Sequence, residues 1–147
     1  MNTRALLIIS IVSILQPLAR AQVSDYLATS AVDAKGIRHT ATEYPRNHPA
    51  WRDDCIKAVG PEYSYADRQR RNMGTGLYRL YIDLKTGDVT SVAVVKSTGV
   101  ATLDTSAMTA FRKWRYKPGK WKQIDLPVTF TLFPPRLSPD AVRLPKA

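Results

Sequence analysis

The stretch LDTSAMTAFRKWRYKP, residues 103–118, has the periodicity of an amphipathic helix. Its apolar residues are spaced i, i+4, i+7, i+8 and i+11, which places them on one stripe: Leu103, Ala107, Ala110, Phe111 and Trp114. We expect Thr102 or Asp104 to cap the N-terminus and Pro118 with Gly119 to end the helix. A one-sided apolar stripe needs a surface to cover, so the stretch predicts a helix packed on a sheet.

Three strand patterns surround this helix. Residues 76–84 (GLYRLYIDL) alternate between an apolar and a mixed face, and residues 89–95 return after the turn Thr86-Gly87-Asp88. Residues 124–132 (IDLPVTFTL) alternate most regularly. Pro127 has no N–H to give to a ladder, which favours an edge position for this last strand.

The order of these elements predicts the topology. A helix between the second and third strands makes those two strands parallel to each other, and the first strand fits between them. We therefore expect a two-layer α+β fold with a three-stranded antiparallel sheet in the order 2-1-3, helices on one face, and the last strand exposed.

The N-terminus has the pattern of a secretory signal peptide. Arg4 precedes the apolar run 5–15 (ALLIISIVSIL), and Ala19-Arg20-Ala21 resembles a cleavage site. An uncleaved membrane anchor is the alternative, but a spanning helix needs about 20 residues. Cleavage after Ala21 would remove two arginines and lower the net charge from +10 to +8. We expect a periplasmic or secreted protein, anchored in the inner membrane if the signal is not cleaved.

The rest of the chain divides into four expected segments. Residues 22–46 show no sustained period and are interpreted as a flexible leader. Residues 47–60 are expected to form an accessory helix that begins near Pro49 and packs through Trp51. Residues 61–133 form the main domain, with a short helix at 65–71, and residues 134–147 are an irregular, proline-rich tail.

The chain has little sign of catalytic or metal chemistry. His39 and His48 are the two histidines, and no spacing typical of a zinc site accompanies them. Cys55 is expected to be a structural thiol, with an intermolecular disulfide as the alternative. Gly74-Thr75-Gly76 precedes a strand and is better interpreted as a turn than as a phosphate loop. We expect no enzyme, no cofactor and no metal site.

A basic cluster follows the apolar stripe. Aromatic residues alternate there with cations over residues 112–122: Arg112, Lys113, Trp114, Arg115, Tyr116, Lys117, Lys120, Trp121 and Lys122. Such a surface can bind an anionic lipid or glycan, whereas nucleic acid is not expected as a partner of an exported protein. The structural interpretation, in which the rings are buried and the cations solvated, is favoured because charge runs are usually solvated.

Several short motifs between Pro61 and Leu132 together resemble one family. In order they are Pro61-Glu62-Tyr63, Ala66-Asp67-Arg68, Gly76 before the first strand, Thr86-Gly87-Asp88-Val89, Lys96-Ser97-Thr98-Gly99, Leu103-Asp104, Trp114-Arg115-Tyr116-Lys117-Pro118 and Val128-Thr129-Phe130. Their order and spacing resemble the C-terminal domain of TonB-type energy transducers. The resemblance implies a two-layer α+β domain that binds an outer-membrane receptor peptide, similar to a TonB box, beside its last strand.

The resemblance and the edge argument together predict a binding site on the last strand. The expected contact residues are Lys122, Gln123, Asp125, Pro127, Thr129 and Thr131, with Arg68 and Arg70 as additional contacts. An inner-membrane anchoring complex is a further possible partner. An exposed edge also permits a homodimer that forms by strand exchange. The alternative function is a basic envelope module that binds anionic lipid or glycan without a transport role.

Overall fold

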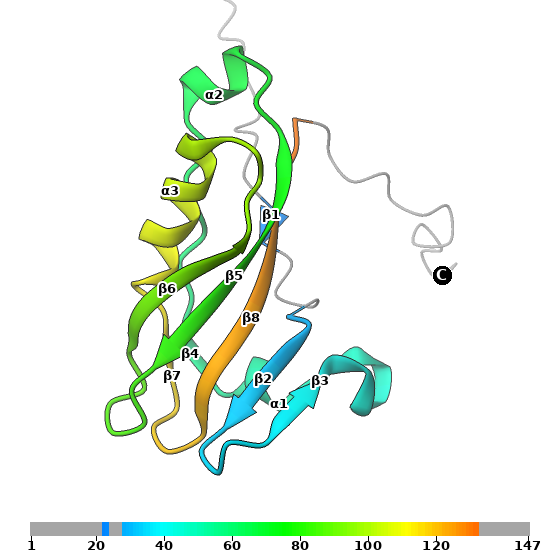
Figure 1. Ribbon diagram of the computed structural model, residues 1–147, viewed down its shortest axis with the longest axis vertical. Helices are drawn as coiled ribbons and strands as arrows, with labels where there is room; N and C mark the ends of the chain where they lie inside the picture. The colour runs from blue at the N-terminus through cyan, green and yellow to red at the C-terminus, as the bar shows by residue number, and fades with distance from the viewer. Residues whose placement is uncertain (1–21, 24–27, 133–147) are drawn as a thin grey trace, which may run out of the picture.

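The computed structural model describes residues 22–23 and 28–132 (Figure 1). The predicted signal peptide, 1–21, and the predicted tail, 134–147, lie outside the described residues. Within the described part, no helix combines the length and the apolar character needed to cross a membrane.

One antiparallel sheet organises the described residues. Its strand order is β3-β2-β8-β5-β6, and β1 also pairs with β8. The strands are β1 (Gln22–Val23), β2 (Ser30–Asp33), β3 (Arg38–Thr40), β5 (Gly74–Ile82), β6 (Val89–Lys96) and β8 (Trp121–Phe130). The longest pairing runs from Gly74 opposite Phe130 to Tyr81 opposite Gln123 without a register shift.

The predicted three-stranded sheet is wrong, although the α+β class is confirmed. The three predicted strands do lie in the order β6-β5-β8, but β1, β2 and β3 extend the sheet beyond β8. These additional strands come from residues 22–40, which were predicted to be a flexible leader. The short β2–β3 hairpin has no strong period of its own because its strands are only 4 and 3 residues long.

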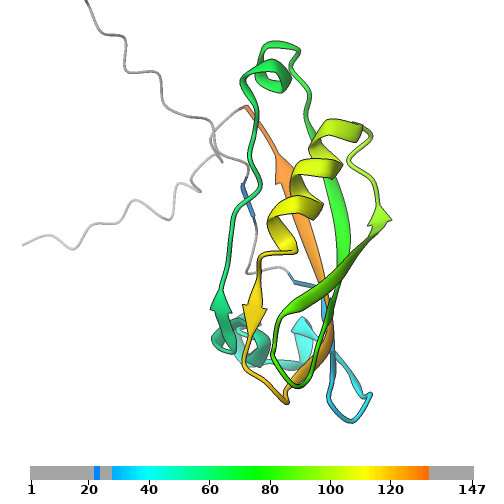
Figure 2. The same ribbon diagram turned by 90° about the vertical axis from the view of Figure 1, so that its left-hand side faces the viewer.

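A second layer covers one face of this sheet (Figure 2). It contains α3 (Ala101–Phe111) and a small two-stranded sheet of β4 (Cys55–Lys57) and β7 (Arg115–Tyr116). The shorter helices are α1 (Ala50–Asp53), α2 (Tyr65–Gln69), and two 3-10 turns, η2 (Ala41–Glu43) and η3 (Pro45–Asn47).

The predicted stripe of the central helix is confirmed. Leu103, Ala107 and Phe111 are fully buried, and Trp114 is 4% exposed. Tyr78 from β5 meets the ring of Phe111 edge to face at a centroid distance of 5.6 Å. Burial of these side chains away from water is the main force that joins the helix to the sheet.

The predicted ends of this helix are wrong. The N-cap is Val100, which makes no side-chain capping bond, and the helix ends at Phe111 rather than at Pro118. Beyond Phe111 the backbone also bonds to distant parts of the chain: the Tyr116 N–H donates to the Gly87 carbonyl at 2.8 Å. Gly87 has a φ of +79°, and a Cβ there would collide with the Tyr116 carbonyl. The turn at Gly87 and the segment after the helix are therefore held against each other, and this close contact requires glycine at position 87.

The predicted accessory helix, 47–60, is also mostly wrong. α1 spans four residues after Pro49, and the next residues form β4 against β7. Trp51 is 2% exposed, which confirms that this segment packs on the domain, but Ile56 is 57% exposed. Pairing of Cys55 with Tyr116 supplies hydrogen bonds that a longer helix would have supplied locally.

Candidate partner-binding edge

The two faces of β8 differ as its sequence predicts. Ile124, Leu126, Val128 and Phe130 are buried beneath the helix layer. The intervening residues point to the other face of the sheet, where Gln123, Pro127 and Thr129 are half-buried. No described helix covers that face (Figure 2).

The outer edge of β8, opposite β5, is occupied in two parts. β2 pairs with residues 121–125, and β1 pairs with Thr129 and Val128. The Asp125 carbonyl accepts a hydrogen bond from the Thr29 N–H at 3.1 Å, so this carbonyl points away from β5. The prediction that the last strand is an exposed edge is therefore wrong, because residues from the N-terminal part of the chain cover it.

Pro127 lies at the break between these two parts. Backbone groups alternate in direction along a strand, so the missing N–H of Pro127 faces outward like the Asp125 carbonyl. The described β1 and β2 pairings leave residues 126 and 127 without a cross-strand partner on that side. Proline was a correct signal for an outward position without a ladder bond, but it did not show that the whole strand is an edge.

Asp125 joins four strands through one carboxylate. Arg79 of β5 holds it with two hydrogen bonds, from Nε at 2.8 Å and from Nη2 at 3.0 Å. Ser30 Oγ of β2 donates to it at 3.1 Å, and Arg38 Nη1 of β3 lies at 3.4 Å. With its amide oxygen toward the guanidinium groups, Gln123 accepts from Arg79 at 3.0 Å and from Arg38 at 3.1 Å. We call these five residues the Asp125 cluster.

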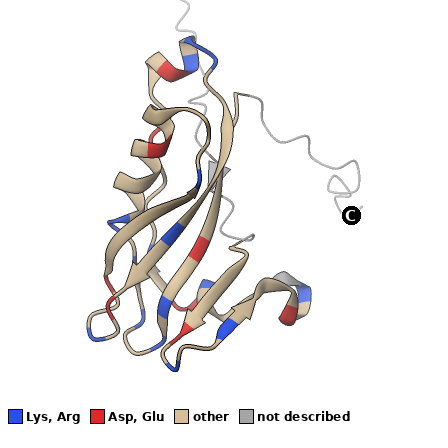
Figure 3. Cartoon of the chain, viewed as in Figure 1, with Lys and Arg blue, Asp and Glu red and all other residues tan. Residues whose placement is uncertain are grey.

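The Asp125 cluster is electrostatically stable. Burial raises the pKa of Asp125, but the hydrogen bonds from Arg79 and Ser30 outweigh this effect and hold the pKa below its ordinary value. The same pairing raises the pKa of the Arg79 guanidinium. Figure 3 shows the acidic segment in the middle of β8 beside a basic segment of β5. The carboxylate therefore stays ionised and links strands.

The predicted contact residues are spread over both parts of the edge and one helix. Lys122 is exposed, and Gln123 and Asp125 belong to the cluster beneath the hairpin. Thr129 Oγ1 lies 3.0 Å from Thr75 Oγ1. Figure 1 shows that α2 lies at the end of the sheet where β8 finishes. The structure thus brings four predicted residues to that end: Arg68, Arg70, Thr129 and Thr131.

Sequence reasoning missed Arg38, Arg79 and Ser30. Arg79 carried a usable signal, since it interrupts the apolar residues of a strand and Asp125 does the same in its neighbour. Opposite charges on adjacent strands of one sheet commonly pair. Arg38 and Ser30 carried none, because their short strands were not recognised.

Aromatic rings hold the segment that follows the hairpin. Trp51 meets Tyr44 at a centroid distance of 5.4 Å and Trp121 at 5.5 Å, both edge to face. His39 of β3 also meets Trp121, at 5.9 Å. Trp121 Nε1 donates to Asp54 at 3.0 Å. The body of the domain therefore fixes Trp121 independently of the hairpin.

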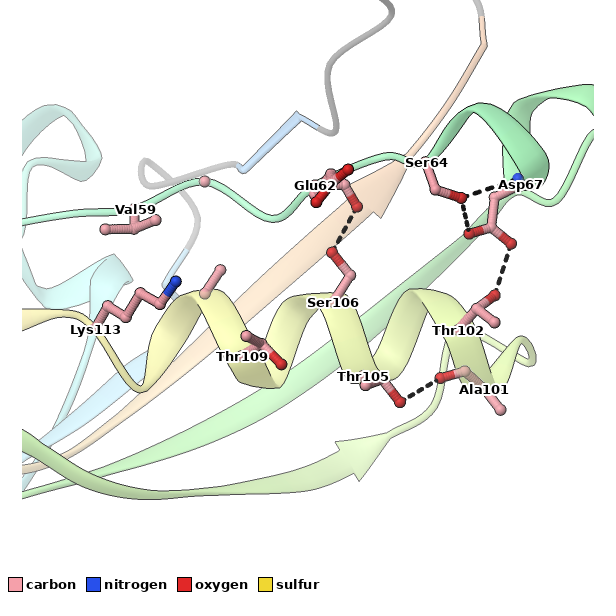
Figure 4. Close-up of a pocket in the computed structure, with 12 residues that line it drawn as sticks. Val59, Glu62, Ser64, Asp67, Ala101, Thr102, Thr105, Ser106, Thr109 and Lys113 are labelled. Carbon is pink, nitrogen blue, oxygen red and sulfur yellow. Dashed lines mark hydrogen bonds between the residues drawn. The ribbon is translucent and has the colours of Figure 1, made fainter.

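A groove of about 710 Å³ runs between α3 and the segment from Val59 to Asp67 (Figure 4). Two of its hydroxyl groups bond to the facing segment: Ser106 Oγ donates to the Glu62 carbonyl at 2.5 Å, and Thr102 Oγ1 donates to Asp67 at 2.6 Å. Ser64 caps α2 by accepting from the Asp67 N–H at 3.1 Å. The bond from Thr102 joins α3 to α2, and the bond from Ser106 joins α3 to the segment before α2.

The basic cluster is partly neutralised. Lys117 Nζ lies 3.0 Å from Asp54, and Arg115 Nε lies 3.5 Å from Asp88. Its rings are buried, with Trp114, Tyr116 and Trp121 between 2% and 6% exposed. Stacking with a polymer would need exposed rings. The rings of the basic cluster are thus part of the core, and the exposed residues of the cluster are its cations.

Together these features define a two-layer α+β domain with a sheet edge that takes part in backbone pairing. Such domains are suited to binding other proteins through their strand edges. The model of the Gram-negative bacterial TonB protein C-terminal family matches residues 59–132, and the chain belongs to this family. Members are non-enzymatic protein-interaction domains of energy transducers, periplasmic or anchored in the inner membrane. No curated protein matches the chain significantly.

Proposed function

We propose that this domain binds an extended peptide of an outer-membrane receptor by strand addition on the outer edge of β8. Family membership supports a protein-binding role in energy-coupled transport. The observation that carries the proposal is the edge itself: within the described structure, the two residues of β1 are the strand partners of its second half, residues 126–130 of β8. Main-chain hydrogen bonds on such an edge give affinity to an extended partner.

The proposed contacts follow the division of the edge. Pro127 and Thr129 lie on the second half, Thr131 directly follows the end of β8, and Arg68 and Arg70 lie at the same end of the sheet. Lys122, Gln123 and Asp125 lie on the first half, beside β2. We therefore propose the first group as the initial contacts and the second group as contacts that depend on the hairpin.

An NMR titration tests this assignment. The probe is a set of synthetic peptides tiled over the N-terminal segments of outer-membrane receptors from the same genome. We expect the largest amide shifts in residues 126–131 and in Gln22 and Val23. Shifts confined to the basic residues 112–122 would contradict the proposal.

A backbone substitution tests the role of main-chain bonds. Backbone groups face the same edge at every second residue of a strand, so the N–H of Thr129 faces outward like the Asp125 carbonyl four residues earlier. Thr129→Pro therefore removes a donor to the peptide without removing one to β5. We expect peptide affinity to fall about tenfold. Thr129→Ala is the matched control, because it keeps the N–H and should retain affinity. Equal loss in both variants would show that the side chain, not the backbone, is recognised.

The same proposal covers the wider assembly. We propose that the apolar run at 5–15 exports the chain and that cleavage leaves a periplasmic domain, which an inner-membrane complex would have to anchor for transduction. Mass measurement of the exported protein tests cleavage after Ala21. A strand-exchanged homodimer would use the same edge, and light scattering with and without peptide tests whether the two compete.

The alternative function, binding of anionic lipid or glycan, is supported by the exposed cations Arg112, Lys113, Lys120 and Lys122. Ionic strength discriminates between the two. Polymer binding should weaken steeply as salt rises, whereas strand addition should change little. Vesicles with anionic lipid are the probe, and vesicles of neutral lipid are their control.

A further inference from the structure

The residues that cover β8 come from outside the region that matches the family. The family model begins at residue 59, whereas the hairpin strands β2 and β3 span residues 30–40. Within the matched region β8 would be the terminal strand, because β5 and β6 lie on its other side. The hairpin thus supplies from the same chain the kind of partner strand that a bound peptide would supply.

The hairpin adds little to the hydrophobic core. Its buried apolar residue is Ala31, joined by Ala28 just before it, and the hairpin exposes 54% of Ile37. Alanine buries little apolar surface compared with Leu or Phe. The remaining links are backbone pairing, the Asp125 cluster and the His39 contact with Trp121. Polar links exchange readily for water, so the hairpin is held less firmly than the helix layer.

Two body side chains that the hairpin contacts, Asp125 and Trp121, each have further partners on the body of the domain. Asp125 keeps two hydrogen bonds from Arg79 when Arg38 and Ser30 leave. Trp121 keeps its contact with Trp51 and its bond to Asp54 when His39 leaves. The large cost of breaking such a cluster usually comes from a buried charge that is left without a partner. Departure of the hairpin leaves no such charge.

The ends of the hairpin suggest how it moves. Its tip is held by a bond from the Ala34 N–H to the Lys120 carbonyl at 2.8 Å. After β3, Tyr44 remains fixed against Trp51. A rotation about residues 41–43 would release β2 and β3 while the rest of the domain keeps its core.

From these observations we propose that the β2–β3 hairpin is a displaceable strand of the same chain, which closes the first half of the β8 edge until an extended peptide replaces it. This proposal rests on the function proposed above. It extends that function: a peptide first takes the place of the two-residue strand β1 and pairs with residues 126–130, and then gains residues 121–125 when the hairpin leaves. The hairpin thus sets the length of strand that a partner must offer.

Hydrogen exchange tests the hairpin without any ligand. Along β8 the N–H groups alternate, so those of Gln123 and Asp125 face β2 and those of Ile124 and Leu126 face β5. A displaceable hairpin exposes the first pair alone, and we expect them to exchange at least about tenfold faster than the second pair. Equal protection of all four amides would show that the hairpin opens only with the whole domain and would overturn the proposal.

A reversible disulfide tests the consequence for binding. Val32 and Gln123 are opposite each other. Such pairs have Cα atoms about 5.5 Å apart, within the range of disulfides. The full chain would carry Val32→Cys, Gln123→Cys and Cys55→Ser. Compared with its own reduced form, the oxidised variant should bind peptide about tenfold more weakly and show shifts confined to residues 126–130.

A matched disulfide on the other side of the sheet is the control. Tyr81 and Ser91 are paired between β5 and β6. Tyr81→Cys with Ser91→Cys, in the same Cys55→Ser background, should leave peptide affinity unchanged in both redox states. Equal binding by the oxidised and reduced hairpin variant would overturn the displacement step and leave the proposed function intact. If no peptide binds any variant, the proposed function fails, and the exchange experiment still decides whether the hairpin opens.

Discussion

The helix layer and the N-terminal hairpin are attached to the same sheet by different forces. α3 places Leu103, Ala107 and Phe111 in the core, all fully buried. The hairpin buries little more than Ala31 and depends on backbone pairing and the Asp125 cluster. Large buried side chains make one attachment as stable as the domain itself. The other can open separately, because small residues and polar contacts add little net free energy.

The largest expected effect is on the helix side. Phe111→Ala removes a fully buried ring that meets Tyr78 and Trp114, and should lower the free energy of unfolding by about 3–5 kcal/mol. Urea denaturation measures it. Ile37→Ala in the hairpin is the comparison and should stay within about 0.5 kcal/mol. Similar losses in both variants would remove the proposed difference between the two regions.

Arg79→Ala tests the body side of the Asp125 cluster. It removes two hydrogen bonds from a carboxylate whose side chain is 7% exposed. Removing one partner of a buried pair is costly, so we expect a loss of about 3 kcal/mol in the free energy of unfolding. Arg79→Lys keeps the charge but cannot make both hydrogen bonds in the same geometry. Its free energy of unfolding should lie between those of the wild type and Arg79→Ala. If Arg79→Ala is neutral, the carboxylate depends on the hairpin instead, contrary to the displacement argument.

Acid should destabilise the domain through three carboxylates. Burial raises the pKa of Asp104 and of Asp125, but hydrogen bonds from Ser97 and Tyr78 to the first and from Arg79 to the second lower each pKa by more. Hydrogen bonds from Ser64 and Thr102 lower the pKa of Asp67. The unfolded chain therefore binds more protons in acid, and stability should fall as the pH drops below about 4.

Thermal unfolding between neutral and acid pH measures this loss. Tyr78→Phe removes the hydroxyl that donates to Asp104 at 2.6 Å, so it should reduce the acid sensitivity. Stability that is constant down to pH values well below the ordinary carboxyl range would contradict the assignment of these bonds.

Arg38→Ala is expected to have the smallest effect on global stability. Its side chain is 48% exposed and lies 3.4 Å from Asp125, so the free energy of unfolding should change by less than about 1 kcal/mol. Exchange of the Gln123 amide should nevertheless become faster while that of Ile124 stays the same. A large global loss from Arg38→Ala would show that the hairpin and the body form one cooperative unit.

Much of the body was predictable from local pattern. The stripe from Leu103 to Phe111 and the alternation from Ile124 to Phe130 both follow from burial on one face, which leaves a period in the sequence. The turn at Gly87 was predictable for a similar reason, since its backbone conformation favours glycine. Part of the site was predictable as well: Pro127 indicated an outward position that lacks a ladder bond.

The remaining features depend on partners far away in the chain. The strands of the hairpin are too short to show a period, and their pairing with residues 121–125 joins segments about ninety positions apart. The helix ends at Phe111, and the following Tyr116 bonds to Gly87, a distant partner that no local pattern predicts.

The sequence by itself therefore determined the α+β class, the helix stripe, the three central strands and the resemblance that led to the family, because each leaves a local periodic or ordered pattern. Tertiary structure alone decided what lies on the outer edge of β8. A short strand forms where it can pair with the free backbone groups of a neighbouring strand. Asp125 contacts Arg79 and Arg38 only when four strands have come together.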